Sequence, residues 1–468
     1  MNILQAIHDA NLLRPWFKRL ADWNAWLAFL AALFALPMTP EQAEAYRKHT
    51  GRTDTPEQPF AEAWLVIGRR GGKSFMMALT AVFLATFRTY RQYLQPGERA
   101  TVRVMAADVK QARVIFRYIE AILHGVPMLA RMIEGESKTS FDLDNAVTIE
   151  VGTASSRSSR GYTYAAVLCD EIAFWPTDDA AEPDYAVLEA IRPGMATIPG
   201  AVLLCGSSPY ARRGALWDAH RRYHGKDGAP VLVWQGSSQE MNPTLSKDVV
   251  ATAYERDPAS AAAEFGAQFR TDVESLLTRE AIAANIEGGV FERPPEKRRT
   301  YRAFVDPSGG SADSMTLAIA HEEDDAPVLD AVREVKPPFS PEAVVREFCD
   351  LVKSYGVRRV TGDRYGGEWP REQFRKLGVE YDLAEKTRSE LYLALVPAIN
   401  SRRCRLLDLP RLELQLVGLE RRTSRVGRDS IDHAPGAHDD VANAVAGAIY
   451  LCRSGRSSYA ASLKAAIG

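Results

Sequence analysis

The sequence is poor in cysteine and histidine, and neither sign of charge dominates it. It contains only five cysteines and eight histidines in 468 residues. No two cysteines form a Cys-x-x-Cys pair or sit at zinc-ligand spacing with a histidine, which favours a reducing cytosol without structural zinc. The 58 basic and 60 acidic side chains give a formal charge of -2, which argues against nonspecific wrapping of nucleic acid. Any nucleic-acid contact must therefore come from local patches.

A membrane-spanning segment is also missing. The one strongly apolar run, at 25–38, is shorter than the roughly 18 residues that a span needs, and no basic region precedes it. We expect a buried helix there rather than an interfacial segment, and no membrane partner. A composition of 46% hydrophobic and 25% charged residues is that of a globular protein, and the length predicts two domains of roughly 200 residues each.

The first half alternates apolar, strand-like runs with helical patterns. The expected strands are Glu62 to Ile67, Val102 to Ala106, Val147 to Val151, Ala165 to Cys169, Val202 to Cys205 and Val231 to Trp234. Helices are expected between them, among them Lys73 to Phe87 and Val109 to Leu123. This alternation predicts an α/β domain over 1–270, with helices covering a mostly parallel sheet.

The second half has a different order of elements. Three strand-like runs, at 301–305, 315–321 and 328–335, lie close enough together for an antiparallel meander, and alternating helices and strands follow. This order predicts an RNase H-like domain over 301–468. The segment 271–300 ends in prolines and charges and is expected to be a linker, and the tail after Arg453 a mobile terminus.

A glycine-rich segment between a predicted strand and helix indicates a phosphate-binding loop. It consists of Gly68, Arg69, Arg70, Gly71, Gly72, Lys73 and Ser74. Glycines let backbone N–H groups converge on phosphate oxygens, while Lys73 neutralises their charge and Ser74 can bind Mg²⁺. The spacing departs from Gly-x-x-x-x-Gly-Lys-Ser/Thr, because Ile67 occupies the first glycine position. The alternative is a glycine-rich turn with a surface lysine.

Two carboxylates end a later apolar strand and strengthen the nucleotide hypothesis. Asp170 is expected to hold Mg²⁺ through water, and Glu171 to polarise the water that attacks the γ-phosphate. A strand that ends in a solvated acidic turn is the alternative, but it does not account for the glycine-rich segment that precedes it in the expected order.

Other polar residues lie near the expected γ-phosphate position. Ser207 and Ser208 follow a strand and could couple hydrolysis to movement, although a serine-rich turn fits equally well. Arg157 and Arg160 lie on a polar segment before the acidic strand, where either could act as an arginine finger that reaches a neighbouring subunit. Solvated loop arginines are the commoner case. Arg69 and Arg70 could also stabilise transferred charge.

The second half contains carboxylates at strand ends and at a helix start. Asp306 and Asp363 end strands, Asp439 and Asp440 open a final helix, and Asp313 is a plausible accessory ligand. Such acids can converge at one edge of an RNase H-like sheet, where two Mg²⁺ or Mn²⁺ ions about 4 Å apart would relieve their repulsion and support phosphodiester hydrolysis. Helix capping and a simple turn are the alternatives. We favour Asp440 over Asp439 as the ligand and leave His438 outside the core set.

An arginine-rich segment lies between these acids in the sequence. Its guanidinium groups belong to Arg421, Arg422, Arg425 and Arg428. Arginines spaced along a hairpin or loop can follow a DNA phosphate backbone, whereas a solvated basic loop is the alternative.

Taken in order, these motifs resemble the large terminase subunit of tailed bacteriophages. The resemblance rests on GRRGGKS, VLCDE, CGSSP, AFVDPSGG, VTGDRYGG and HDDVANA, and it covers most of the chain. It implies an N-terminal P-loop ATPase domain of the ASCE type and a C-terminal RNase H-like nuclease domain, with ATP and Mg²⁺ as cofactors. Lys73, Ser74, Asp170 and Glu171 would then carry ATP hydrolysis, and Arg160 would be the finger that acts in trans.

The same resemblance implies a setting for the protein. Expected partners are double-stranded viral DNA, the portal protein of a procapsid and a small terminase subunit, with the chain assembled as a homo-oligomeric ring on the portal. The expected location is the cytoplasm of the infected bacterial host, and not the mature virion. Two rival hypotheses stay open: a capsid-independent helicase-nuclease of repair or recombination, and a catalytically silent prophage remnant.

Overall fold

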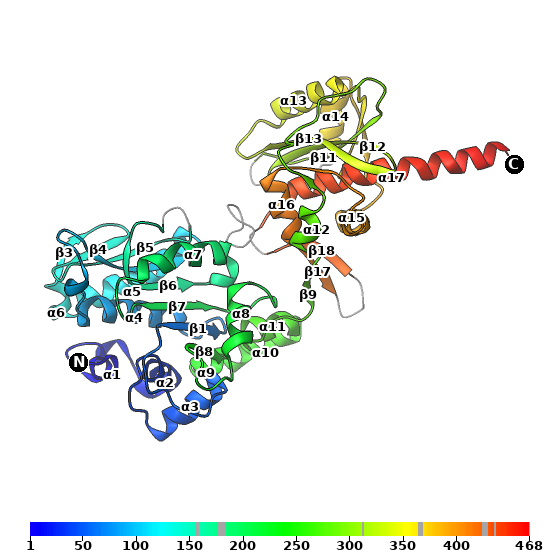
Figure 1. Ribbon diagram of the computed structural model, residues 1–468. Coiled ribbons are helices and arrows are strands. Elements are labelled where there is room, and N and C mark those ends of the chain that lie inside the picture. Colours follow the sequence, from blue (N-terminus) through cyan, green and yellow to red (C-terminus); the bar gives the residue numbers. More distant parts are fainter. Residues whose placement is uncertain are drawn as a thin grey trace. The chain divides into compact units, whose positions relative to one another are not determined.

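The computed structural model describes residues 1–155, 159–175, 183–310, 313–363, 368–423, 429–434 and 437–467 (Figure 1). The chain divides into two compact units. Of the described residues, the first comprises those up to 271 and the second those from 272 to 467. Among the described helices, none combines the length and the apolar character that crossing a membrane would need.

The first unit contains an eight-stranded sheet in the order β3-β4-β5-β2-β6-β7-β1-β8. Its strands are β1 (Glu62–Ile67), β2 (Ala100–Ala106), β3 (Ile133–Glu136), β4 (Ser140–Leu143), β5 (Val147–Thr153), β6 (Thr163–Asp170), β7 (Val202–Ser207) and β8 (Val231–Gly236). All pairs from β5 to β8 are parallel, as predicted, whereas β3 and β4 are antiparallel additions. The sequence did not indicate these two short strands, because they alternate half-exposed polar residues with few apolar ones.

Helices cover both faces of this sheet. They are α1 (Ile3–His8), α2 (Asn24–Leu33), α3 (Pro40–Thr50), α4 (Lys73–Phe87), α5 (Val109–Gly125), α6 (Pro127–Ala130), α7 (Pro183–Met195), α8 (Gly214–Tyr223), α9 (Ser238–Met241), α10 (Lys247–Arg256) and α11 (Pro258–Glu264). Successive side chains of a strand point to opposite faces. On β1, Leu65 accordingly belongs to the core beneath α2 and α4, and Val66 to the core beneath α7 and α8.

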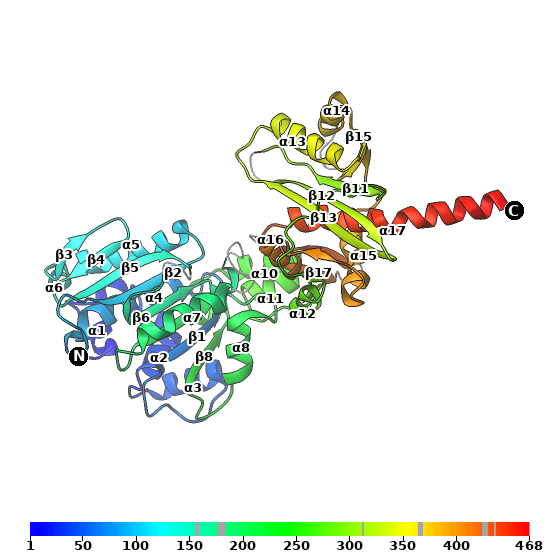
Figure 2. The ribbon, with the colours of Figure 1, turned by 45° about the horizontal axis from the view of Figure 1, so that its top comes forward.

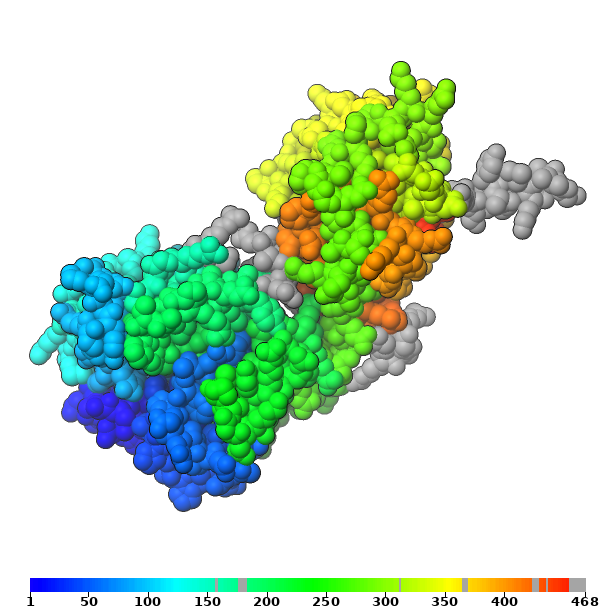
Figure 3. Space-filling model, viewed as in Figure 1, coloured from blue at the N-terminus to red at the C-terminus, as the bar shows by residue number. Residues whose placement is uncertain are grey.

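The apolar run at 25–38 forms a buried helix, as predicted. Residues Trp26 to Leu33 of α2 are all buried, and they pack in the same core as α4. The space-filling view shows the N-terminal segment, coloured blue, closely packed against the rest of the first unit (Figure 3). The run therefore belongs to the folded core of this unit.

The second unit is built on a five-stranded sheet in the order β13-β12-β11-β14-β15. Its strands are β11 (Tyr301–Asp306), β12 (Met315–Glu323), β13 (Ala326–Val335), β14 (Arg359–Gly362) and β15 (Glu380–Leu383). The first three are antiparallel, while β14 and β15 run parallel to β11. This is the predicted RNase H-like arrangement.

Two helical layers enclose the sheet of the second unit. The remaining elements are β9 (Val273–Ser275), α12 (Arg279–Ala283), β10 (Ile286–Glu287), α13 (Pro341–Ser354), α14 (Glu368–Lys376), α15 (Arg388–Asn400), β16 (Leu406–Leu407), α16 (Pro410–Val417), β17 (Leu419–Thr423), β18 (Asp429–His433) and α17 (Asp440–Ile467). Figures 1 and 2 show α17 along one side of the sheet and α13 and α14 on the other, in agreement with two separate cores.

One expectation about the second unit needs correction. The segment 271–300 was expected to be a linker, but it carries β9, α12 and β10, and Leu277 and Ile282 are buried in the same core as α17. The tail after Arg453 was expected to be a mobile terminus; it continues α17 to Ile467, and its mobility stays a prediction. The small and apolar residues between 460 and 467 are compatible with a helix, although the serines of 454–458 suggested irregular structure.

Candidate functional site

The carboxyl ends of three parallel strands meet at one edge of the first sheet. Asp170, the last residue of β6, pairs in register with Gly206 of β7, and Ser207 pairs with Val66 of β1. The loop after β1 and the acids after β6 therefore lie on opposite sides of β7. One strand between the phosphate loop and the acidic strand is the arrangement expected of an ASCE-type domain.

The phosphate loop has a backbone that requires glycine. Gly72 caps α4 at φ 94°, in the left-handed region that other residues adopt at a cost of about 1–2 kcal/mol. A Cβ atom on Gly68 would lie 2.4 Å from Ser238 Oγ and 2.6 Å from the Phe265 carbonyl oxygen. The absence of a side chain at Gly68 thus lets the segment after β8 close against the loop.

Side chains outside the motif hold the loop through its backbone carbonyls. Trp26 Nε1 donates to the Gly71 oxygen at 2.8 Å, Ser238 Oγ to the Arg69 oxygen at 2.6 Å, and Asn242 Nδ2 to the Arg70 oxygen at 2.9 Å. The Arg69 guanidinium lies 3.3 Å from Glu264 Oε1, and Arg70 is exposed with φ 64°. The loop is also held through its amides, because the Gly68, Arg69 and Gly71 N–H groups donate to the backbone oxygens of Gly236, Glu264 and Gly68.

The loop and the acidic strand end are in direct contact. Lys73 Nζ lies 3.2 Å from Glu171 Oε1 and donates to the Ile67 oxygen at 3.1 Å. Ser74 Oγ donates to Asp170 Oδ2 at 3.2 Å. The structure therefore brings together all four residues that the sequence predicted to act on ATP, although Ile67 replaces the first glycine of the motif.

Glu171 also contacts the residues at the carboxyl end of β7. Its backbone is left-handed, with φ 50°, directly after β6. Its Oε2 accepts hydrogen bonds from Ser207 Oγ at 2.9 Å and from the Ser208 backbone N–H at 3.3 Å. Both serines are buried, so their hydroxyls contact the proposed catalytic glutamate rather than solvent.

Burial and neighbouring charges shift the pKa values of Asp170 and Glu171 in opposite directions. Burial raises the pKa of Asp170 to about 6, and the neighbouring charge of Glu171 adds to this effect. Burial alone would raise the pKa of Glu171, but Lys73 and the hydrogen bond from Ser207 lower it below its ordinary value. Glu171 is thus held ionised, as a base must be, while Asp170 gains from a nearby cation.

The chemistry of this donor set fits Mg²⁺. Asp170 Oδ1 is buried without a hydrogen-bond partner, and Asp170 Oδ2 lies beside the Ser74 hydroxyl. A carboxylate and a hydroxyl next to a phosphate-binding loop are oxygen ligands of the kind that Mg²⁺ takes in nucleotide sites. Arg160 is exposed in the turn before β6, and Arg157 lies outside the described residues.

A second set of acids lines one cavity of about 880 Å³ in the second unit. Its acidic lining residues are Asp306, Asp313, Asp363, Asp439 and Asp440, and His438 also faces it. Val305 pairs with Gly362 between β11 and β14, so Asp306 and Asp363 follow at equivalent positions on neighbouring parallel strands. The start of α17 joins them because Thr316, the β12 partner of Asp306, donates its hydroxyl to the Asp440 carbonyl at 2.8 Å.

Burial and neighbouring acids raise the pKa values of Asp306 and Asp440. Burial raises the pKa of Asp306 to about 8, and Asp440, Asp363 and Asp439 add to this while a hydrogen bond from Asn443 opposes it. Burial and Asp439 raise the pKa of Asp440 to about 6. Uncompensated negative charge of this kind favours a divalent cation.

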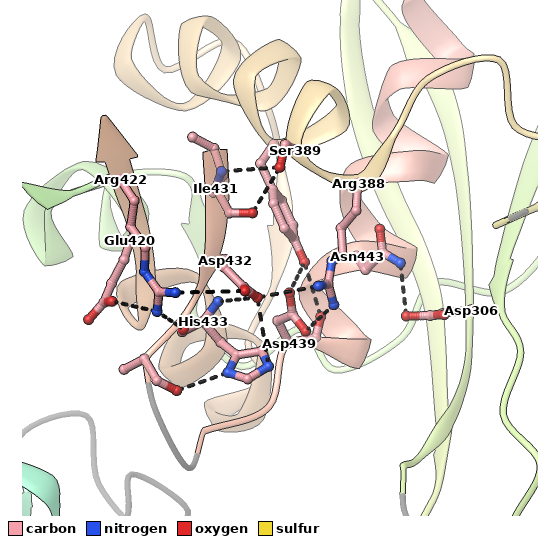
Figure 4. A network of polar contacts seen from close by, with 12 residues as sticks. Asp306, Arg388, Ser389, Glu420, Arg422, Ile431, Asp432, His433, Asp439 and Asn443 are labelled. Atoms are coloured by element: carbon pink, nitrogen blue, oxygen red, sulfur yellow. Dashed lines mark hydrogen bonds and ion pairs between the residues drawn. The ribbon is translucent and has the colours of Figure 1, made fainter. Parts of the chain in front are cut away.

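The individual acids differ in their partners. Asp439 is 2% exposed, and its two oxygens are bound by Arg388 Nη1 at 3.0 Å and by the Tyr392 hydroxyl at 2.8 Å (Figure 4). Asp440 Oδ2 has no hydrogen-bond partner. Within the described ranges, no group of three or more His, Cys, Asp or Glu side chains is arranged to hold a metal ion. The acids predicted to bind metal therefore line one cavity, and the metal site itself stays a prediction.

Two residues that sequence reasoning missed shape this cavity. Asn443 Nδ2 donates to Asp306 Oδ2 at 2.8 Å, and Arg388 contacts Asp439. Helical spacing could have indicated Asn443, since it follows Asp440 by three positions and shares its helix face. Nothing local to the sequence distinguishes Arg388 from other arginines.

The predicted DNA-binding arginines lie on a hairpin, and those that are described form ion pairs. Arg421 Nε donates to Asp429 Oδ2 at 2.8 Å across the β17–β18 pair. Arg422 Nη2 lies 3.2 Å from Glu420 Oε2. Arg425 and Arg428 lie outside the described residues. In the described part of the hairpin, the guanidinium groups of Arg421 and Arg422 are therefore both paired with carboxylates.

Comparisons with known proteins identify a P-loop domain in the first unit. Residues 35–267 match the family model described as "Uncharacterized protein MJ0330, N-terminal P-loop domain". This range includes the phosphate loop, Asp170 and Glu171. None of the curated proteins compared with the chain matches it.

Similar solved structures come from bacteriophages. The large terminase of bacteriophage HK97 is 15% identical, with 88% of this chain and 95% of that chain covered and a TM-score of 0.39. The large terminase of a thermophilic bacteriophage, in complex with ADP, is 11% identical, with coverages of 83% and 93% and a TM-score of 0.38. The large terminase nuclease of the thermophilic phage G20c with bound magnesium is 14% identical, with coverages of 38% and 96% and a TM-score of 0.33. These are structures of the family that the sequence motifs resemble.

Proposed function

We propose, from the premise that the chain carries an N-terminal P-loop domain, that it is the ATP-hydrolysing and DNA-cutting subunit of a viral DNA-packaging motor. Its first unit would translocate double-stranded DNA into a procapsid, and its second would cut the DNA with a metal-dependent endonuclease. The observation that carries the proposal is the contact of Lys73 with Glu171 and of Ser74 with Asp170 at one sheet edge. The acid-lined cavity of the second unit is the site proposed for DNA cleavage.

Each residue of the first site has a role in hydrolysis. Lys73 would exchange its contact with Glu171 for the β- and γ-phosphates, which frees that carboxylate to orient and deprotonate the attacking water. Mg²⁺, held by Ser74 and Asp170, would supply charge neutralisation at the phosphates. Ser207 and Ser208 hydrogen-bond to Glu171 and so would sense its change of partner, which couples hydrolysis to β7 and the chain beyond it.

The second site would use its acids in the same way for phosphodiester hydrolysis. Asp306, Asp363 and Asp440 would hold Mg²⁺ or Mn²⁺, with Asp313 as an accessory ligand. The ions would supply an activated water and stabilise the leaving oxygen. We favour Asp440 over Asp439 because Asp440 retains an oxygen without a hydrogen-bond partner. Arg421, Arg422, Arg425 and Arg428 would follow the DNA backbone from the hairpin.

The resemblance of the motifs extends the proposal to partners and setting. The subunit would assemble as a homo-oligomeric ring on the portal protein, receive viral DNA with the help of a small terminase subunit, and act in the cytoplasm of the infected bacterium. Arg160 is exposed before the acidic strand and would act on the nucleotide of a neighbouring subunit.

Reciprocal variants test whether the two sites are separate. Glu171→Ala should lower ATP turnover by about 100-fold or more while plasmid cleavage with Mg²⁺ or Mn²⁺ persists, because one general base typically contributes that much. Asp363→Ala should abolish cleavage and leave ATP turnover intact. Glu189→Ala and Asp350→Ala replace exposed acids of the same two units and serve as controls. Loss of both activities from either site variant would contradict the proposal, and DNA strand separation without a portal would favour a helicase-nuclease.

A further inference from the structure

An arginine lies at the edge of the acid-lined cavity without a role in the chemistry described so far. Arg388 is the first residue of α15, and it lines the cavity together with Lys386. Figure 4 shows the Arg388 side chain next to Asn443, with dashed lines from its guanidinium to Asp439 and Asp432. The side chain is 40% exposed, so the guanidinium is open to a ligand that enters the cavity.

Two carboxylates fix the direction of this guanidinium. Arg388 Nη1 donates to Asp439 Oδ1 at 3.0 Å, and Arg388 Nη2 to Asp432 Oδ1 at 3.3 Å. Asp439 is itself held by the Tyr392 hydroxyl, which donates to its other oxygen at 2.8 Å. Tyr392 is fully buried. One Asp439 oxygen therefore orients Arg388, and the other is held by Tyr392 in the core.

The guanidinium keeps donors for a further partner. A guanidinium has five N–H donors in a planar fork, and the two carboxylate contacts use two of them. Planar forks of this kind bind phosphate oxygens well. A DNA backbone that approaches five acids needs local positive charge, and among the described residues that line this cavity Arg388 and Lys386 are the basic side chains with permanent charge.

We propose that Arg388 binds a backbone phosphate of DNA in the acid-lined cavity, and that Asp439 positions Arg388 instead of binding a metal ion. Arg388 is then a catalytic residue that contacts the substrate, and Asp439 is a positioning residue that acts through it. Both assignments rest on the proposed nuclease function.

The first test measures DNA binding without metal. The full chain is titrated onto a short fluorescent DNA duplex in EDTA at several salt concentrations. Arg388→Gln should weaken binding and reduce the slope of log Kd against log salt by about 1, as expected for the loss of one phosphate contact. Arg388→Lys keeps the charge and should retain the slope. Arg333→Gln is the matched control, since Arg333 is 33% exposed, pairs with Glu292 at 3.0 Å and lies in the same unit away from the cavity.

The second test separates positioning from metal binding. With Mn²⁺, Arg388→Gln should lower the rate of cleavage about 100-fold, the usual effect of removing one donor from a transition-state anion. Asp439→Asn should weaken DNA binding in EDTA as Arg388→Gln does, and its Mn²⁺ affinity by calorimetry should stay at the wild-type value. The double variant should be no worse than Arg388→Gln alone, because both changes remove one interaction.

The outcomes distinguish failure of this inference from failure of the proposed function. If wild-type protein cleaves DNA and Arg388→Gln behaves as Arg333→Gln does in both tests, Arg388 does not contact phosphate. A several-fold loss of Mn²⁺ affinity in Asp439→Asn would make Asp439 a metal ligand and overturn its positioning role. If wild-type protein neither binds nor cleaves DNA, the nuclease function itself is wrong. Unchanged ATP turnover and unfolding temperature in each variant exclude loss of the fold as the cause.

Discussion

At the scale of single residues, environment decides which of several similar carboxylates can do which task. Asp170 and Glu171 are adjacent in sequence, yet their pKa values move in opposite directions: burial dominates at Asp170, whereas Lys73 and the hydrogen bond from Ser207 outweigh burial at Glu171. Asp439 and Asp440 are likewise adjacent, and only Asp439 has both oxygens bound. The roles of adjacent acids are therefore determined by the groups around them and not by residue type.

The raised pKa of Asp306 predicts how stability depends on pH. The pKa is about 8 in the folded chain, well above the ordinary value near 4, so the folded state binds a proton that the unfolded state has lost. In EDTA the free energy of unfolding of the second unit should fall as pH rises from about 5 to about 8, by at most about 1.4 kcal/mol for each pH unit. Chemical denaturation at several pH values measures this, and Asp306→Asn should flatten the dependence. Equal slopes in wild type and variant would contradict it.

At the scale of elements, close packing of a helix on a strand sets the geometry of the acid-lined cavity. α17 carries Asp440 and Asn443, and β11 carries Asp306. One turn beyond Asn443, a Cβ atom on Gly447 would lie 2.2 Å from the ring of Phe304 on β11. The missing side chain at Gly447 therefore lets the helix approach the strand closely enough for Asn443 to reach Asp306.

A methyl group at this contact should disturb both stability and activity. Gly447→Ala should lower the free energy of unfolding by about 1–3 kcal/mol, since overpacking outweighs the gain in helix propensity of about 1 kcal/mol. DNA cleavage should fall with it, because Asp306 and Asp440 would move apart. Gly288→Ala is the matched control, as a Cβ atom there meets no atom within 4 Å. Denaturant unfolding of both variants provides the comparison, and an unchanged Gly447→Ala protein would show that the helix has room to move.

At the scale of the whole molecule, the two units have separate cores and separate candidate sites. The buried residues of the first sheet and those of the second fall into different clusters. Each candidate site is built from residues of one unit. We assign the charge-stabilising arginine to a neighbouring subunit because the motifs resemble those of large terminases and because Arg160 is exposed before the acidic strand.

Assembly should therefore be needed for full ATP turnover. Arg160→Ala should lower turnover of the assembled protein by about 1,000-fold, the lower end of the effect of an arginine finger. A mixture of Arg160→Ala and Lys73→Ala subunits should regain part of the wild-type rate, because each supplies what its neighbour lacks. Steady-state hydrolysis measures both, with the exposed Arg131→Ala as control. A mixture as inactive as its components would assign Arg160 to its own subunit or to no catalytic role.

The sequence by itself determined the α/β order of the first unit, the meander of the second and the identity of the acids and of Lys73 and Ser74. These depend on local features, because a strand, the loop after it and the next helix are consecutive along the chain. The boundaries were less well determined: the segment 271–300 folds because it packs in the core of α17, which lies far away in sequence.

Only the tertiary structure decided how the sites are completed. Trp26 reaches the phosphate loop across 45 positions, and Arg388 reaches Asp439 across 51. Such pairs leave no periodic or local signal, since the two side chains meet only after the sheet and its helices have packed. For the same reason the preference for Asp440 over Asp439 stays a prediction that their contacts support: two neighbouring residues at a helix start point in different directions, and only the fold determines what each one meets.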